Sequence, residues 1–340
     1  MLARMTLEVP DVAASRTWHA DRPFRTFRPS RAAGYFLMRG MAVKPEAVSS
    51  SILPAERPDI LERIAPGNLF QPATVLWRVY EIEAVLRHVS FGGRILDLGC
   101  GDGTLSSVIF RGQESSTLIG LEVDPADAEI ARRSGIYAAV HCAPGDSIPE
   151  PDQAFDIVFS NSVLEHIPKI EPVLGEVGRV VRAGGRFVFT VPSEEFHSCL
   201  SGKGPLPFLW RMRGQSVEES IDRRLQHHRY WSPDEWIRAL RPLGFSTFAV
   251  HRYLPEPVVR AWETISNLTG GLAFELFGRN TQTRGLQRRL SLGKLDSHTP
   301  PGMSRAILRT LLAKHLSQPT EVDGQRSGGL LITATKQSMA

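Results

Sequence analysis

The chain has 340 residues and a mass of 37.7 kDa, which suits one large α/β domain with additions or two modest domains. Hydrophobic residues make up 42% and charged residues 22%, so the chain can bury a sizeable core and is not disordered as a whole. Its 3 cysteines are far apart, which argues against a disulfide framework and fits a reducing compartment. No apolar run approaches the ~18 residues that span a bilayer, and residues 1–10 lack the apolar core of a secretory signal. We therefore expect a cytoplasmic protein.

Charge is divided unevenly along the sequence. Residues 90–195 hold 8 basic and 16 acidic residues, a net charge of −8, whereas residues 196–340 hold 20 basic and 11 acidic residues, a net charge of +9. Most of the basic residues are arginine, which binds phosphate and carboxylate groups better than lysine does. A GC-rich genome would produce the same bias, so this pattern alone leaves both explanations open.

The first half of the chain predicts a parallel sheet. Residues 1–65 lack sustained periodicity and predict a partly irregular N-terminal arm. Apolar residues at helical spacing predict a helix over 73–89, and a second helical stripe over 170–181 is expected to be closed by Gly184 and Gly185. Apolar strands alternate with helices over ~100 residues, which is typical of a doubly wound, mostly parallel sheet. The first five strands are expected from Arg94 and at 117–122, 137–141, 155–160 and 187–191.

The second half is less regular. Residues 192–231 carry Gly, Pro and many aromatic residues and predict a long excursion. Ser232 to Glu235 forms a capping box that opens a helix ending at Gly244. Strands are expected at 245–250 and 328–335, with two or more helices over 257–316. The predicted organisation is the arm at 1–65, a main domain at 66–256 with the insertion 192–231, a helical insertion at 257–327, and a final strand and tail at 328–340.

A glycine-rich turn follows the first strand. It runs from Asp97 to Gly103, and its glycines let the backbone turn sharply and approach a ligand closely. A dinucleotide-binding turn would need Gly or Ala where Thr104 stands, and the two acids of this turn would repel a pyrophosphate. Glu122 ends the second strand, where a carboxylate can accept both hydroxyls of a ribose. The turn therefore favours a nucleoside ligand that carries a positive group.

Four stretches of the sequence form a recognisable series. They are, in order, Ile95 to Thr104, Ile119 to Pro125, Ala154 to Ser160 with Val163 to Ile167, and Ala183 to Phe187. In these stretches residues 93–191 resemble class I S-adenosylmethionine-dependent methyltransferases of the type 11 group. The resemblance implies a seven-stranded sheet, Rossmann-like with helical insertions, whose final strand is antiparallel; 245–250 and 328–335 would be the sixth and seventh strands. It also implies S-adenosyl-L-methionine as cofactor.

The resemblance implies roles for individual residues. Asp97 and the backbone of the turn would hold the methionine end, and Glu122 would bind the ribose hydroxyls. Asp146 would meet the adenine amine, and two residues past the fourth strand would line the methyl-donor side; ordinary turn chemistry would equally explain Asp146 and Asn161. The cofactor-binding residues expected on this basis are Asp97, Gly99, Cys100, Gly101, Glu122, Asp146, Ser160 and Asn161.

Two histidines are candidate catalytic residues. A hydroxyl acceptor benefits from a base within hydrogen-bond reach, and histidine suits neutral pH. His166 follows the fourth strand, at the edge where ligands bind in open sheets. His228 lies on the excursion, and each histidine could instead be structural. Ser160 and Asn161 do not supply the carboxylate cluster of catechol-type enzymes, so the sequence predicts no metal and an oxygen or nitrogen acceptor on a small molecule.

The two insertions are the expected sites of specificity. Both are basic with apolar faces, which suits an anionic acceptor, such as a lipid-linked or phosphorylated sugar precursor, or peripheral contact with an acidic membrane. Surface helices, a lid or a dimer face would give the same pattern. Nucleic acid is disfavoured as a partner because the basic arm at 22–39 belongs to no known module. The main alternative function is an inactive S-adenosylmethionine-binding partner or regulatory protein; a nicotinamide-dependent oxidoreductase ranks third, weakened by Thr104.

Overall fold

The computed structural model describes residues 57–66, 68–113, 116–272, 275, 300–319, 324 and 326–337. Every described residue belongs to one compact unit, within residues 52–340. Most of the predicted arm therefore lies outside the described residues. Its last part, however, forms helix α1 (Arg57–Ile64), whose Ile60, Leu61 and Ile64 are buried in the core.

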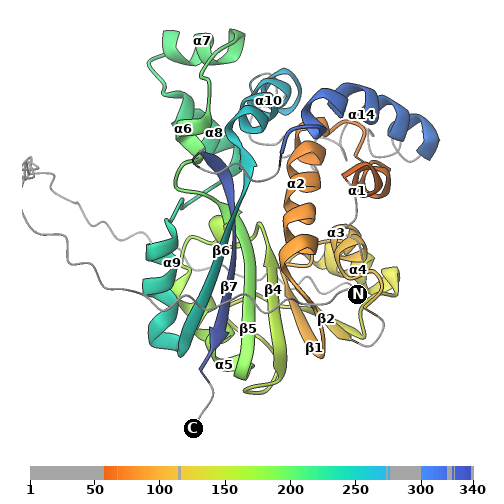
Figure 1. Ribbon diagram of the computed structural model, residues 1–340, viewed down its shortest axis with the longest axis vertical. Helices are drawn as coiled ribbons and strands as arrows, with labels where there is room; N and C mark the ends of the chain where they lie inside the picture. The colour runs from red at the N-terminus through yellow and green to blue at the C-terminus, as the bar shows by residue number, and fades with distance from the viewer. Residues whose placement is uncertain are drawn as a thin grey trace, which may run out of the picture. The chain divides into compact units, whose positions relative to one another are not determined.

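A seven-stranded sheet forms the centre of this unit (Figure 1). Its order is β3-β2-β1-β4-β5-β7-β6, and β7 runs antiparallel to both of its neighbours while the other pairs are parallel. This confirms the predicted fold class and the positions of the last two strands. The strands are β1 (Arg94–Leu98), β2 (Thr117–Glu122), β3 (Ala139–Cys142), β4 (Phe155–Asn161), β5 (Val181–Pro192), β6 (Phe245–Pro255) and β7 (Ser327–Lys336).

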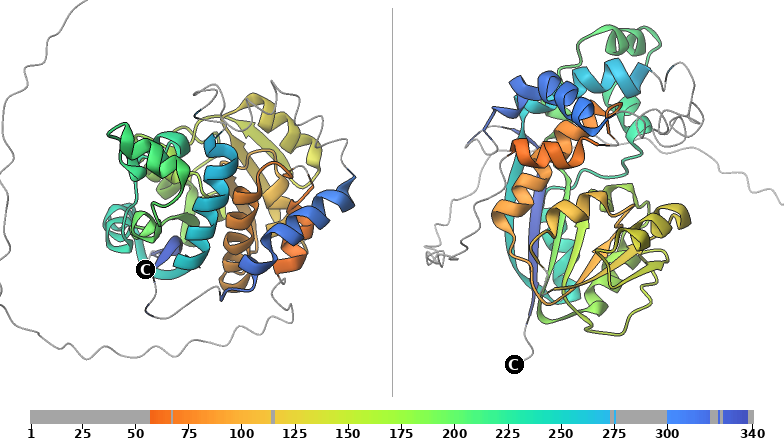
Figure 2. Two further views of the ribbon diagram at one scale, coloured as in Figure 1. Left: turned by 90° about the horizontal axis from the view of Figure 1, so that it is seen from above. Right: turned by 90° about the vertical axis from the view of Figure 1, so that its right-hand side faces the viewer.

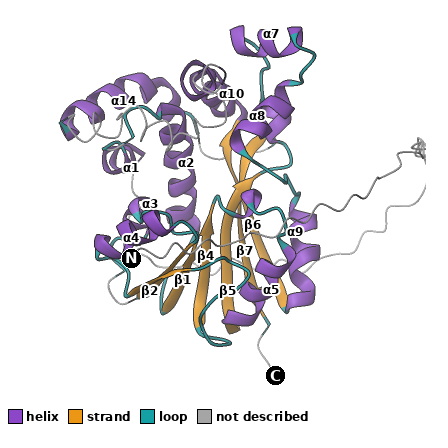
Figure 3. Ribbon diagram, turned by 180° about the vertical axis from the view of Figure 1, so that it is seen from behind, coloured by secondary structure: helices purple, strands orange, loops and turns teal. Residues whose placement is uncertain are grey.

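Helices cover both faces of the sheet (Figure 3). Helices α2 (Pro72–His88), α3 (Thr104–Ile109) and α4 (Pro125–Ser134) lie on one face, and α5 (Glu171–Val180) and α9 (Pro233–Leu240) lie on the other. Apolar side chains alternate between these faces along the regular part of the strands. On β4, Ile157 and Phe159 join the core beneath α2, whereas Val158 joins the core beneath α5 and α9.

Further helices lie beyond the carboxyl ends of the parallel strands (Figures 1 and 2). They come from the two predicted insertions and pack partly on α2, where Trp77 makes edge contacts with Phe196 and Trp262, each at 5.8 Å between ring centroids. No helix in the described part of the chain is long and apolar enough to cross a membrane. These helices are α6 (Phe196–Cys199), α7 (Pro205–Met212), α8 (Val217–Leu225), α10 (Glu256–Ser266) and α14 (Pro301–Leu316).

Local signals succeed at one helix boundary and fail at another. At α9 the predicted capping box is present, because Glu235 accepts from the backbone and the hydroxyl of Ser232, both at 2.8 Å. At α5 the helix ends at Val180 rather than at the predicted glycine pair. Val181 is already extended and pairs with Phe155, so pairing between β4 and β5 ends the helix. The two glycines lie in the irregular part of β5 that follows.

Candidate functional site

The glycine turn is held in one conformation by β2. Gly99, Gly101 and Gly103 all have positive φ, from +57° to +81°, a region that other residues adopt only with strain. The amides of Gly99 and Cys100 both donate to the carbonyl of Leu121, at 2.8 and 3.1 Å. A Cβ added at Gly99 would stand 2.5 Å from Cγ2 of Val163. The turn therefore packs against the segment that follows β4, and only glycine fits there.

Glu122 is fixed at the end of β2 by backbone amides. One carboxylate oxygen accepts from Gly101 at 2.8 Å, and the other accepts from Val123 and Asp124, both at 2.9 Å. Each carboxylate oxygen can accept two hydrogen bonds, so acceptor capacity remains for a ligand. The side chain is half-buried beside the turn, which is the position that the sequence predicts for a ribose-binding carboxylate.

Asp97 is the buried acid at the start of the turn. Ser106 and Tyr137 donate to it at 2.5 and 2.7 Å, and both bonds use Oδ2. Burial, which outweighs these two hydrogen bonds, raises the pKa of Asp97 to about 6. A cation beside Asp97 would stabilise its charged form, so the site is electrostatically suited to the ammonium end of an amino acid.

The other residues predicted to bind the cofactor lie in differing surroundings. Cys100 is buried, and burial raises the pKa of its thiol, so only its backbone suits a ligand. Asp146 is exposed in the turn after β3. Ser160 is fully buried and donates to the carbonyl of Leu98 at 3.1 Å, so its hydroxyl joins β4 to β1. The roles of these residues stay predictions.

A buried carboxylate on α2, Glu81, organises the carboxyl edge of β4 and β5. It is 0% exposed. Burial alone would raise its pKa, but Arg78 and the hydrogen bonds around it hold the pKa below its usual value. Its polar partners come from α2, β4, β5 and β6: Arg78, Asn161 at 3.1 Å, Ser162 at 2.5 Å, Thr190 at 2.8 Å and Tyr253 at 3.0 Å.

Sequence reasoning missed Glu81, although an acid inside a mainly apolar helix is a signal. Almost every residue over the first 14 positions of α2 is buried, so a carboxylate in that stretch must find internal partners. The predicted Asn161 is one of them, with its Nδ2 donating to Glu81 and its Oδ1 3.0 Å from the hydroxyl of Thr190. Asn161 is therefore positioned at the edge by a network rather than by turn chemistry alone.

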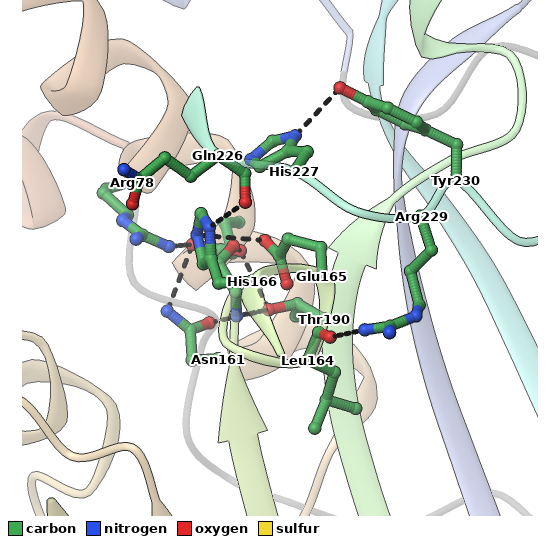
Figure 4. Close-up of polar contacts among 12 residues, drawn as sticks. Arg78, Asn161, Leu164, Glu165, His166, Thr190, Gln226, His227, Arg229 and Tyr230 are labelled. Atoms are coloured by element: carbon green, nitrogen blue, oxygen red, sulfur yellow. Dashed lines mark hydrogen bonds and ion pairs between the residues drawn. The ribbon is translucent and has the colours of Figure 1, made fainter. Parts of the chain in front are cut away.

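A second polar group lies just past β4 (Figure 4). The short 3-10 helix η1 (Leu164–His166) brings Glu165 and His166 there, and the loop after α8 brings His227. Glu165 is 2% exposed, and burial raises its pKa to about 8. The side chain of His166 is exposed enough to contact a ligand. The ring of His227 packs edge to face against the ring of His166, with 4.9 Å between the ring centroids. One ligand atom from each of the three lies within 4.8 Å of the others.

The loop after α8 is clamped onto η1 by Arg229 and His228. Arg229 donates to three carbonyls, those of Leu164, Ile167 and Pro168. The amide of His228 donates to the carbonyl of Glu165 at 2.8 Å, whereas its side chain is exposed. Of the two histidines predicted as catalytic, His166 thus lies within the group and His228 lies beside it. His227, which the sequence did not single out, faces His166.

Together these parts can hold a nucleoside with a cationic end at β1 and β2, beside a polar site past β4. A family model described as a methyltransferase domain matches residues 58–250 of the chain. The match covers more than half of the sequence and includes the glycine turn, Glu122, η1 and the clamped loop.

Relatives of known sequence agree. An uncharacterized methyltransferase of Schizosaccharomyces pombe is 36% identical over 166 residues, 46% of this chain and 61% of that protein. A fatty-acid O-methyltransferase of Mycolicibacterium smegmatis is 34% identical over 101 residues, 29% of this chain and 37% of that protein. A ubiquinone biosynthesis O-methyltransferase of Rhizobium etli is 33% identical over 107 residues, 29% of this chain and 42% of that protein. The chain thus spans less than two thirds of the length of each.

Among solved structures, an S-adenosylmethionine-dependent methyltransferase of Thermotoga maritima is 18% identical, with a TM-score of 0.46; the match covers 83% of this chain and 100% of that chain. Geranyl diphosphate C-methyltransferase of Streptomyces coelicolor is 12% identical, with a TM-score of 0.46, over 79% of this chain and 82% of that chain.

Proposed function

The chain belongs to the class I S-adenosylmethionine-dependent methyltransferases, and from this premise we propose that it methylates an oxygen of a small acceptor that carries a lipid. Methyl transfer is a displacement at the sulfonium carbon, so the enzyme supplies alignment and exclusion of water. The cofactor is S-adenosylmethionine. The acceptor and its reacting atom are the proposed part.

Glu122 carries the cofactor side of the proposal. Three backbone amides hold its carboxylate beside the glycine turn, and a ribose hydroxyl would take the acceptor position that remains on Oε2. Asp97 would meet the ammonium through Oδ1, because both of its internal bonds use Oδ2. Asp146, exposed after β3, would meet the adenine amine.

The polar group past β4 supports an oxygen acceptor. A hydroxyl must lose its proton on methylation, and a base within hydrogen-bond reach accelerates that loss. His166 presents its Nε2 at this edge, since Nδ1 is engaged by the carbonyl of Gln226 at 3.3 Å. Burial, the largest influence, lowers the pKa of His166, which keeps the imidazole neutral and able to accept. Two relatives named above are O-methyltransferases.

The lipid part of the proposal rests on α7. Phe208 and Met212, one helical turn apart, are 60% and 71% exposed, and the neighbouring Arg211 and Arg213 are exposed as well. An apolar face bordered by arginines suits the surface of an acidic membrane or an anionic lipid. A relative that acts on fatty acids agrees with this assignment.

Calorimetric titration with S-adenosylmethionine and S-adenosylhomocysteine tests the cofactor side. We expect micromolar binding, weakened at least tenfold in Glu122→Gln because the amide nitrogen cannot accept a hydrogen bond. The control is Glu129→Gln, which removes an acid from exposed ion pairs on α4. Equal affinity in both variants would show that Glu122 does not hold the ribose, and binding of neither ligand would overturn the function.

Release of S-adenosylhomocysteine in the presence of acceptors tests the other side. The panel is long-chain fatty acids, phenols with and without a lipid tail, and phosphorylated sugars. We expect turnover with oxygen acceptors that carry a lipid, and a lower rate in Phe208→Ser than in wild type. Turnover only with amines, or equal rates with and without the lipid tail, would contradict the proposal.

A further inference from the structure

Glu165, His166 and His227 meet at the carboxyl edge of β4 (Figure 4). We propose that these three side chains bind one divalent transition-metal ion, which in turn binds the acceptor hydroxyl. The inference rests on the proposed function for the acceptor, but the metal site itself stands on the geometry. The three ligand atoms lie within 4.8 Å of one another, with Nε2 of His166 3.9 Å from Oε1 of Glu165.

Both imidazoles are oriented in the way that metal ligands require. A carbonyl can only accept, so Nδ1 of His166 donates to Gln226 at 3.3 Å. Tyr230 gives its proton to Asp222, so its oxygen accepts from Nδ1 of His227 at 3.0 Å. In both rings Nε2 therefore carries the lone pair. Ligating histidines almost always have the other ring nitrogen held by such a partner.

The surroundings of the Glu165 carboxylate are a second, independent indication of a metal site. Oε2 of Glu165 is buried and has no hydrogen-bond partner among the described residues. An isolated buried carboxylate without a partner for one of its oxygens is costly. Arg78 and Arg229 offset this cost only in part, because Arg78 pairs with Glu81 and Arg229 donates to backbone carbonyls. A cation would offset this cost.

The ligand set selects the class of ion. Two imidazoles and one carboxylate suit Zn²⁺, Fe²⁺, Co²⁺ or Mn²⁺, whereas Mg²⁺ prefers oxygen ligands and retained water. Ligands of such an ion stand roughly 3 to 3.5 Å apart, so the group must close by about 1 Å. His166 can supply this movement, since its side chain is 43% exposed. Its exposed side also leaves room for an acceptor oxygen.

The ion would take over proton removal. A hydroxyl bound to it becomes more acidic and releases its proton to water. The resulting oxyanion attacks the methyl carbon of the sulfonium, so a C–O bond forms as the C–S bond breaks. Sulfur keeps the bonding electron pair and leaves as the neutral thioether. In this arrangement Nε2 of His166 is a ligand rather than the proton acceptor.

The sequence predicts no metal because Ser160 and Asn161 supply no carboxylate cluster. The proposed set is of another kind, since two of its ligands follow β4 and the third comes from a loop some 60 residues away, beyond α6, α7 and α8. Spacing alone does not reveal such a set. The clamp of Arg229 and His228 on η1 is what brings His227 to the other two.

The test uses the full chain, dialysed against a chelator and titrated with Zn²⁺ and with Co²⁺. We expect one ion per chain and, for Co²⁺, visible absorption of a four- or five-coordinate site. Glu165→Gln and His227→Gln should each weaken binding at least tenfold. His141→Gln is the control. His141 pairs with Glu150 at 2.9 Å beside the exposed Cys142, so these residues are an alternative binding site for a transition-metal ion.

Absence of saturable binding, or wild-type affinity in both site variants, would overturn the proposal, as would loss of binding in His141→Gln. The calorimetric affinity for S-adenosylmethionine is measured on the same samples and should not depend on the metal. Undiminished methyl transfer by the chelated enzyme would overturn the part of the ion in the reaction while leaving the proposed function intact. Metal binding without any methyl transfer would support the metal site and contradict the proposed function.

Discussion

The two halves of the site are built in different ways. On the cofactor side, the glycine turn and Glu122 are held by backbone amides of residues one to about 20 positions away. On the acceptor side, Glu81 pairs with Arg78 on its own helix, but its other partners are side chains 80 to 172 residues away. The carbonyl of Glu165 accepts from the amide of His228, in the loop after α8. The cofactor side is thus mainly local, and the acceptor side exists only once the whole sheet and its insertions have assembled.

This difference teaches where each half is vulnerable. Among substitutions only proline removes a backbone N–H, so the cofactor side is disrupted mainly by changes in the path of the turn. The acceptor side depends on buried charges, and a buried charge that loses its partner is strongly destabilising. Substitutions at the centre of each half should therefore differ in size and in readout.

The largest effect is expected for Glu81→Gln. Arg78 loses its ion pair and at least two of the donors around the carboxylate lose their acceptor, so we expect the free energy of unfolding to fall by about 3–5 kcal/mol. Chemical denaturation measures it. Glu129→Gln, on the surface of α4, should change nothing measurable, and an equally small effect for Glu81→Gln would refute the central role of this carboxylate.

An intermediate effect is expected for Gly99→Ala. The added Cβ would be strained by the positive φ and would stand 2.5 Å from Val163. We therefore expect the free energy of unfolding to fall by about 2–3 kcal/mol and S-adenosylmethionine to bind at least tenfold more weakly. Gly112→Ala is a matched control, because its φ is +75° but nothing lies within 4 Å of the added Cβ. Equal losses in the two variants would mean that strain alone, and not the contact with Val163, fixes the turn.

The smallest effect concerns pH and Asp97. Burial raises the pKa of Asp97 to about 6 in the folded protein. The folded state therefore binds this proton more tightly than the unfolded state does, and the stability that the proton contributes is lost as pH rises from about 4 to 6. A cationic ligand favours the charged form, so affinity for S-adenosylmethionine should fall up to about tenfold per pH unit below 6. Calorimetry at pH 5 to 8 measures this slope.

Asp97→Asn separates the two consequences of that charge. The variant should bind S-adenosylmethionine more weakly at pH 8 and lose the slope below pH 6. At pH 8 the free energy of unfolding of Asp97→Asn should nevertheless be higher than that of the wild type, because the variant buries no charge at this position. A slope that persists in Asp97→Asn would assign the titration to another group.

Much of the fold could be predicted because its signals are local. The alternation of strands and helices, the strand positions and the capping box at Ser232 depend on neighbours in sequence. The end of α5 was wrong because pairing between Val181 and Phe155, a contact across the sheet, outweighs the pair of glycines.

The candidate site divides in the same way. Glu122 and the turn could be found from motif spacing, since the chemistry of their ligand is carried by adjacent residues. Glu81 and His227 could not, because their importance arises from contacts with Tyr253 and with η1, far away in sequence. The sequence analysis singled out His228 and not His227, because both lie on one loop and only the folded loop decides which of the two faces the group past β4.

The place of β7 has a consequence for how the protein is made. β7 fills the position between β5 and β6, yet residues 256–326 separate it in sequence from β6. While the ribosome synthesises that stretch, β5 and β6 each expose an edge that no other strand of the described sheet can satisfy, and such edges invite aggregation. Nascent chains stalled before residue 327 should therefore engage chaperones strongly, and release from the chaperone should follow the emergence of β7 from the exit tunnel.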